Sequence, residues 1–345
     1  MPALPPLAQR ASVKEDARPA RRGRMRMSLR ASVWRSLLIL LVSTTAAPAT
    51  DLRIVAPSAP SSGWDQLAQG MRAALAERSP SSNVEVVNIP GGGGTTGLGQ
   101  FLADPLEDQL LVTGLGMVTS ILVRHAPVTL DRMTPIARLC AEHYLVVVPA
   151  SSPIRNFGEL RAAFQSNPAK VSWAGGPAGG IDHVAAALFA RAIGVDPQAL
   201  NYVPFLATPD AVGALVERKV TAGFLPRVEL VAALKAETVR VLAIASTDRV
   251  ERIAAPTLKE NGTDLEVFNW RGVVAKPGIR PAERDALTKL VTEMVSTAGW
   301  KDIVESRGWE PAFMAGDEFA AFVRDEHARV KAVLKATGTL RRETE

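Results

Sequence analysis

The stretch Val84-Glu85-Val86-Val87-Asn88-Ile89-Pro90-Gly91-Gly92-Gly93-Gly94-Thr95-Thr96-Gly97 decides the fold class of this 345-residue chain. Residues 84–87 are a β-branched run typical of a strand, residues 91–94 are four consecutive glycines, and a helix is expected from about Thr95. A strand that leads through a glycine loop directly into a helix is half of a βαβ unit. The stretch therefore predicts an α/β protein.

The same order recurs on both sides of this stretch. Before it, a predicted strand over Leu52–Ala56 leads through a Pro/Ser/Gly turn into a helix whose apolar residues recur every three or four positions from Trp64 to Leu75. After it, the sequence predicts strands at 110–113, 136–141, 144–148, 171–174, 201–204, 221–225 and 239–245. It predicts helices near 157–165 and 181–193, a helix in each interval between the last three of these strands, and three closing helices.

The length is enough for about two domains of ~150 residues. Pro149–Pro153 is the first plausible linker, because the strand–helix alternation restarts after it. The run Leu265–Ala275 is long for one strand and is interpreted as the return crossing. We therefore expect a first lobe of residues 50–149 plus 269–345, a second lobe of residues 150–268, and two crossings between them.

Residues 1–49 are predicted to be a leader. An Arg-rich segment up to Arg35 precedes the apolar run Leu37–Val42, and Ala47-Pro48-Ala49 fits a signal-peptidase site. The apolar run is far shorter than the ~20 residues of a membrane span. The expected location is thus the periplasm, with cleavage near Ala49, and an anchored or cytoplasmic protein with a basic arm is the open alternative.

The positive charge of the chain belongs to this leader. The formal net charge is +5, but residues 1–49 hold nine of the 40 Lys and Arg and two of the 35 Asp and Glu. The remainder carries 31 basic and 33 acidic residues, a net charge of −2. No nucleic-acid partner is therefore expected. The single cysteine, Cys140, lies in an apolar run and is interpreted as an inert core thiol.

Three strand-to-helix turns are candidates for a binding site. They cover residues 57–65, 90–97 and 175–183 and are rich in Gly, Ser and Thr. In open α/β sheets such loops line the ligand crevice, and the first N–H groups of the following helix have no intrahelical acceptor. Two loops of the first lobe that face one loop of the second predict an anion clamp without fixed cationic side chains.

Each loop also has a structural interpretation. Ser62 to Asp65 fits a capping box, so the Asp65 carboxylate either stabilises its own helix or faces the cleft. His183 either donates to a ligand carboxylate or is a structural histidine. Trp64 is expected to pack in the core on one face and to line the pocket on the other.

Catalysis finds little support in the sequence. The four histidines, at 125, 143, 183 and 327, lack metal-ligand spacing. There is no G-x-S-x-G nucleophile elbow and no Lys-Ser/Thr after the glycine run. We therefore expect neither an enzyme nor a bound metal or cofactor.

Several segments, in order, resemble the substrate-binding receptors of tripartite tricarboxylate transporters. They are residues 54–65, 88–94, 146–149, 173–183, 201–205, 220–223, 243–245, 256–258, 269–273 and 316–319. The resemblance implies a type II-like, two-lobed α/β periplasmic binding protein, in which each lobe is a βα-alternating sheet flanked by helices. It implies capture of a small tricarboxylate, dicarboxylate or related organic acid and its delivery to a membrane permease, with the chain acting as a monomer.

In the family, ligand carboxylates are held mainly by backbone N–H groups and waters from these loops. Carried over to this chain, the implied substrate-binding residues are Ser58, Ser61, Ser62, Gly63, Trp64, Asp65, Gly92, Gly93, Gly94, Thr95, Thr96, Gly176, Gly179, Gly180, Asp182, His183 and Thr208.

The chain departs from the family pattern in its second lobe. Leu206 to Asp210 and Phe224 to Arg227 replace small polar residues, which predicts a bulkier, more apolar pocket and a smaller or aromatic acid as ligand. An extracytoplasmic sensor that feeds a signalling partner, or an enzyme that uses the loops as an oxyanion site, are the alternative functions.

Overall fold

The computed structural model describes residues 52–78, 83–206, 208–246, 248–250 and 253–340. The predicted leader and its cleavage site lie outside them. The described strands form a ten-stranded sheet with the order β2-β1-β3-β9-β4-β7-β5-β6, with β8 and β10 each paired to β4. The strands are β1 (Leu52–Ala56), β2 (Val84–Asn88), β3 (Gln109–Gly114), β4 (Thr134–Pro149), β5 (Ser172–Gly175), β6 (Asn201–Pro204), β7 (Ala222–Pro226), β8 (Val239–Ile244), β9 (Phe268–Ala275) and β10 (Glu310–Ala315).

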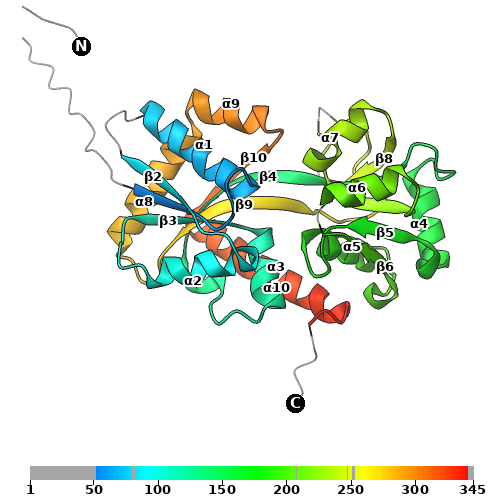
Figure 1. The fold of residues 1–345 in the computed structure, drawn as a ribbon, viewed down its shortest axis with the longest axis horizontal. Coiled ribbons are helices and arrows are strands. Elements are labelled where there is room, and N and C mark those ends of the chain that lie inside the picture. The colour runs from blue at the N-terminus through cyan, green and yellow to red at the C-terminus, as the bar shows by residue number, and fades with distance from the viewer. Residues whose placement is uncertain (1–51, 79–82, 207, 247, 251–252, 341–345) are drawn as a thin grey trace, which may run out of the picture. The chain divides into compact units, whose positions relative to one another are not determined.

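The long strand β4 belongs to both halves of this sheet. Its first part, from Thr134 to His143, pairs with β9, and residues 137–141 also pair with β10. Its second part, from Tyr144 to Pro149, pairs with β7 and β8. Figure 1 shows β4 and β9 running between two groups of elements. We call β1–β3, β9, β10 and the first part of β4 with their helices the first lobe, and β5–β8 and the second part of β4 with theirs the second lobe.

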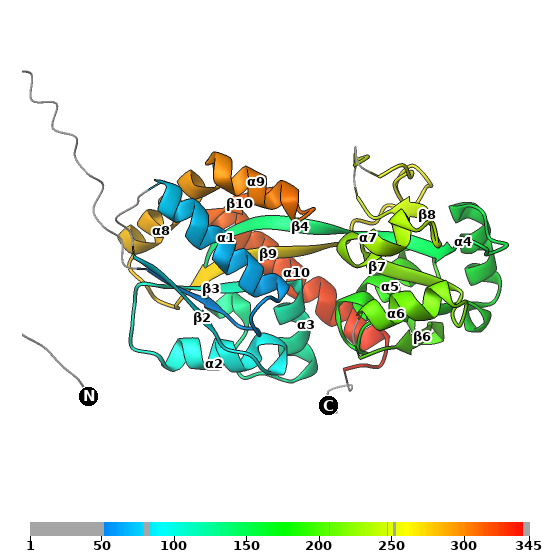
Figure 2. The same ribbon diagram turned by 45° about the horizontal axis from the view of Figure 1, so that its top comes forward.

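Helices cover both faces of the sheet in each lobe (Figure 2). In the first lobe, α1, α8 and α9 pack on one face, and α2, α3 and α10 on the other. In the second lobe, α4 and α5 pack on one face, and α6 and α7 on the other. The helices are α1 (Gly63–Arg78), α2 (Thr95–Ala103), α3 (Leu115–Val123), α4 (Phe157–Ser166), α5 (Ile181–Ala192), α6 (Thr208–Val216), α7 (Arg227–Lys235), α8 (Pro281–Val295), α9 (Ala298–Ser306) and α10 (Gly316–Ala336).

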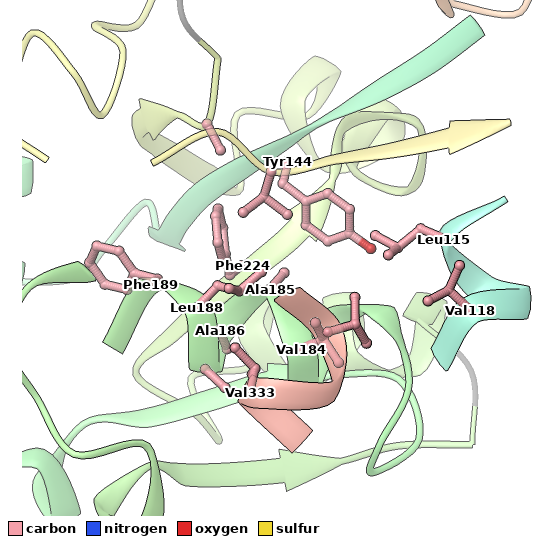
Figure 3. Packing of buried hydrophobic residues seen from close by; sticks show 14 of the residues in the cluster. Leu115, Val118, Tyr144, Val184, Ala185, Ala186, Leu188, Phe189, Phe224 and Val333 are labelled. Carbon is pink, nitrogen blue, oxygen red and sulfur yellow. The ribbon is translucent and has the colours of Figure 1, made fainter. Parts of the chain in front are cut away.

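One hydrophobic cluster extends across both lobes. Leu115 and Val118 of α3 share it with Val184 of α5 and Val333 of α10 (Figure 3). A Cβ added at Gly116 would lie 3.3 Å from Cδ1 of Ile181, so α3 and α5 approach closely here. Buried apolar contact between the lobes stabilises their packing by roughly 25 cal/mol per Å² of surface removed from water.

The structure confirms the predicted strand–helix alternation, adds helix α3, which was not predicted, and corrects two details of the strands. The runs 136–141 and 144–148 are parts of one strand, because the polar Glu142 and His143 between them lie on opposite faces of β4 and do not interrupt its pairing. Strand β10 was not predicted, since its burial is incomplete and Pro311 weakens the strand signal. The lobe boundaries at 149/150 and 268/269 stay a prediction.

Within the described residues, no helix combines the length and the hydropathy needed to cross a membrane.

Candidate functional site

A cavity of about 370 Å³ lies where β4 and β9 meet the helix N-termini of both lobes. Its volume is within the range of small-ligand sites. The first lobe, with the crossing strands, and the second lobe both contribute to its lining: Ser61, Ser62, Gly63, Gln66, Glu142, Tyr144, Ile181, Asp182, Thr208, Pro226, Val228, Glu229, Asn269, Arg271, Arg307 and Trp309.

The alternation of side chains along the two crossing strands places polar groups in this cavity. Glu142 and Tyr144 of β4 line it, whereas His143 lines another cavity. Asn269 and Arg271 of β9 line it for the same reason, since successive residues of a strand point to opposite faces. Two strands that are otherwise largely apolar thus supply a polar surface for the site.

Arg271 and Glu142 form a buried ion pair on this surface. Arg271 Nη1 lies 2.7 Å from Glu142 Oε1, and the two side chains are 8% and 4% exposed. The register explains the contact, because Cys140 faces Arg271 and Glu142 faces Asn269, which makes Glu142 and Arg271 diagonal neighbours. The guanidinium also lies 5.0 Å from the centre of the Trp309 ring. Arg271 is therefore held on two sides before any ligand binds.

The first predicted loop reaches the cavity through Ser61, Ser62 and Gly63. A Cβ added at Gly63 would lie 2.9 Å from Arg271 Nη2, so a larger residue here would require the guanidinium to shift away from the N-terminus of α1. The first turn of α1 carries N–H groups without intrahelical acceptors. This corner of the cavity therefore combines a helix N-terminus with a fixed cation, contrary to the expectation of a clamp without cationic side chains.

Asp65 and Ser58 hold this loop in shape. The Asp65 carboxylate is 7% exposed and accepts hydrogen bonds from Ser61 N (2.7 Å), Asn88 Nδ2 (3.0 Å) and Gln69 Nε2 (3.2 Å). Burial by itself raises the pKa of this carboxyl. The hydrogen bonds together lower the pKa by more than burial raises it, so the pKa lies below its ordinary value. Ser62 Oγ donates to Ser58 Oγ at 2.5 Å. The geometry matches the structural interpretation of Asp65, which lies outside the cavity lining.

The second predicted loop supports the first and does not line this cavity. Gly91 to Gly94 all have positive φ, and a Cβ at Gly94 would lie 2.8 Å from the Trp64 ring. The Trp64 ring also lies next to Gly114 and Gly116, where a Cβ would be 3.4 Å from its nearest atom. Gly92, Gly93, Gly94, Thr95, Thr96 and Trp64 are thus outside the lining of the cavity, and direct binding by them stays a prediction.

The third predicted loop is organised around Asp182. Its carboxylate, 6% exposed, accepts hydrogen bonds from Tyr144 Oη (2.7 Å), Gly176 N (2.8 Å) and Thr208 Oγ1 (3.0 Å). Burial raises the pKa of Asp182, and these hydrogen bonds offset that effect in part. The carboxylate therefore joins β4, the loop and the start of α6, and it faces the cavity at the same time.

His183 has a structural role in this loop. Its Nδ1 accepts a hydrogen bond from Gly179 N at 3.0 Å, and its ring lies 4.4 Å from that of Tyr202. Burial lowers its pKa, which favours the neutral ring. Gly176, Gly179, Gly180 and His183 do not line the cavity.

Sequence reasoning missed Glu142, Tyr144, Asn269, Arg271 and Glu229. A signal existed for the first four: charged or polar residues inside apolar runs that were assigned to crossing strands. The segment 269–273 was used for the family resemblance, but its arginine was not considered as a ligand group.

The prediction of a bulky, apolar pocket in the second lobe is wrong, because the large apolar residues on which it rested do not line the cavity. Phe224 and Leu225 are fully buried in the core, and Leu206 is 94% exposed. Of the substituted residues, Thr208 and Pro226 line the cavity. The reason is the alternation along β7, which turns the large side chains toward the hydrophobic clusters of the second lobe.

His143 lines a larger cavity, of about 800 Å³, with Arg138, Phe268 and Phe322. Its Nδ1 has no hydrogen-bond partner among the described residues. Burial, with a smaller effect of Arg227, lowers its pKa to about 4.

We expect acid to destabilise the fold through His143. An unfolded histidine titrates near pH ~6.5, so between about pH 6.5 and 4 the unfolded chain binds the proton more readily. The stabilising contribution of the neutral ring is complete above pH ~6.5 and is lost as pH falls to about 4, by up to ~3 kcal/mol. Urea unfolding at several pH values should show that the free energy of unfolding falls less between pH ~6.5 and about 4 in His143→Phe than in the unchanged protein. The exposed His125, replaced by Asn, is the control, and an unchanged pH dependence in His143→Phe would contradict the assignment.

Among the described residues, no three His, Cys, Asp or Glu side chains are arranged to hold a metal ion. Cys140 is buried without a disulfide, and burial raises the pKa of its thiol to about 12, in agreement with an inert core thiol.

Two β/α lobes joined by crossing strands, with a cavity at their junction, define a two-lobed solute-binding protein. Comparison with known families identifies it further. The model of the tripartite tricarboxylate transporter family receptors matches residues 65–339, and the chain belongs to that family. The family is one of periplasmic solute-binding receptors that work with a membrane transporter.

Relatives agree with this assignment. The protein BugT of Bordetella pertussis is 24% identical over 308 residues, which cover 86% of this chain and 92% of BugT. The crystal structure of a TctC solute-binding protein from Polaromonas, without ligand, has a TM-score of 0.74 at 24% identity and covers 84% of this chain and 99% of its own. MatC from Rhodopseudomonas palustris, solved with bound malate, has a TM-score of 0.64 at 23% identity, and the match covers 84% of this chain and 100% of MatC. The structures confirm the two-lobed fold.

Proposed function

We propose that this chain captures a small organic acid in the cavity between its lobes and delivers it to a tripartite tricarboxylate-type transporter in the membrane. It is exported, with cleavage of the leader near Ala49, and acts as a receptor without turnover of its ligand. The lobes, divided at 149/150 and 268/269, open and close about β4 and β9.

The observation that carries this proposal is the corner where the Arg271 guanidinium meets the N-terminal turn of α1 at Gly63. A carboxylate placed there accepts charge-assisted hydrogen bonds from the guanidinium and lies at the positive end of the helix dipole. Ser61 and Ser62 also line the cavity. The Ser62 hydroxyl already donates to Ser58, so only the Ser61 hydroxyl adds a donor whose direction can adapt. Support comes from the family and from MatC, a relative of the same fold that was solved with malate.

The first experiment is a thermal-shift screen of mono-, di- and tricarboxylic acids, amino acids and aromatic acids. The protein is recovered from the periplasm of an expression host, its N-terminal residue is determined, and it is unfolded and refolded to remove any bound ligand. At about 100 times the dissociation constant, a ligand should stabilise the protein by about 2.7 kcal/mol. A selective shift with an acid that is recovered unchanged supports the receptor. Binding of uncharged analogues with equal affinity, or conversion of the acid, would contradict it.

A further inference from the structure

The side of the cavity that the second lobe supplies is acidic, and we call it the acidic wall. Asp182 at the start of α5 and Glu229 in the first turn of α7 both line the cavity from the second lobe, and Glu142 lines it from β4. The Glu142 charge is balanced by Arg271 at 2.7 Å. The cavity therefore has one balanced pair and two further carboxylates.

Neither of these two carboxylates has a cationic partner among the described residues. The three donors to Asp182 are a phenol, a hydroxyl and a backbone N–H, all of them neutral. Glu229 has no hydrogen bond or ion pair to any described residue, although it is only partly exposed. Arg307, the second cation in the lining, is exposed to solvent. A partly buried carboxylate without a cation is unfavourable unless something else supplies the charge.

A structural role in capping α7 does not account for Glu229. Acids in a first helical turn are stabilised by the helix dipole, which favours the ionised form. The pKa of Glu229 is instead raised, first by burial and then by the charges of Glu142 and Asp182. The helix dipole at the start of α7 therefore does not compensate for the burial of Glu229 and for the repulsion by Glu142 and Asp182.

We propose that the ligand is an amino acid or a related zwitterion, with its carboxylate at Arg271 and Gly63 and its ammonium group at Glu229 and Asp182. This inference rests on the proposed function and specifies its ligand class. An ammonium group relieves the repulsion among the carboxylates of the acidic wall, whereas the second carboxylate of a dicarboxylic acid increases it. The cavity thus selects for an ammonium group at one end and a carboxylate at the other.

Matched pairs of ligands test this directly. The pairs are alanine and propionate, 4-aminobutyrate and butyrate, aspartate and succinate, and glutamate and glutarate, measured by calorimetry with the refolded full chain. In at least one pair the amino member is expected to bind 10-fold or more tightly than its partner. Glu229→Gln should weaken binding of that amino acid by 10-fold or more and leave its partner unchanged or tighter. Glu217→Gln, an exposed acid elsewhere in the second lobe, is the control and should change neither.

The outcomes separate this inference from the proposed function. If the acids without an amino group bind as well as their partners, or Glu229→Gln leaves the preference intact, the zwitterion is excluded and the organic-acid receptor stands. If simple amines such as butylamine bind and no carboxylic acid does, the acidic wall is confirmed as a cation site but the proposed function fails. If nothing in either series binds, the zwitterion is excluded, and the proposed function fails as well if the tricarboxylic and aromatic acids of the first screen also do not bind.

Discussion

Arg271→Met is expected to lower the free energy of unfolding by about 3–5 kcal/mol, because it leaves Glu142 buried without its cation. Asn269 Nδ2, at 3.4 Å from Glu142 Oε2, is too distant to replace the guanidinium. The variant also loses the contact with the Trp309 ring. Urea unfolding at pH 7 measures the change.

The double variant Glu142→Gln/Arg271→Met is the matched control. It removes both charges, so most of the lost stability should return, since a buried ion pair contributes little beyond its apolar replacement. A double variant as unstable as the single one would show that the packing of the guanidinium, rather than its charge, matters. If the double variant folds, it also tests binding: a ligand-induced shift of unchanged size would show that Arg271 does not contact the ligand.

Asp182→Ala is expected to lower the free energy of unfolding by about 2–4 kcal/mol, since it leaves two buried donors and one partly buried donor without their acceptor. The loss should come with weaker ligand binding, because the carboxylate fixes the loop before α5 relative to β4 and lines the cavity. Tyr144→Phe removes one of the three donors and keeps the packing of the ring against Phe224, so it should cost only about 1 kcal/mol. Chemical unfolding of the two variants side by side makes the comparison. Equal losses would show that the Tyr144 hydroxyl alone accounts for the role of Asp182.

Local sequence patterns determined most of the fold. β-branched runs, glycine loops and the three- to four-residue apolar period predicted every described strand except β10 and every described α-helix except α3, because these signals depend on neighbours within a few residues. The two crossing strands followed from the linker at Pro149 and from the long run before Ala275. The missed strand β10 has a weaker pattern, because it is only partly buried and pairs with one strand among the described residues.

The candidate site was predictable only in part. Ser61, Ser62, Gly63, Asp182 and Thr208 follow from their place at the ends of strands, where α/β proteins bind ligands. The sequence did not decide whether Asp65 and His183 hold their own loops or contact a ligand, because a carboxylate or an imidazole in a first helical turn can do either. Their hydrogen bonds to the loop backbone decide the question.

The sequence by itself determined the α/β class, the order of the elements and the loops that lie near the cavity, since all of these are consequences of local patterns. Only the tertiary structure decided which charges meet. Arg271 is 129 residues from Glu142 in the chain, and Glu229 is 47 residues from Asp182, so no local pattern relates them. The register of β4 against β9 and the approach of α5 and α7 at one cavity bring them together. The charge balance of the cavity, and with it the ligand it favours, is therefore a property of the folded molecule.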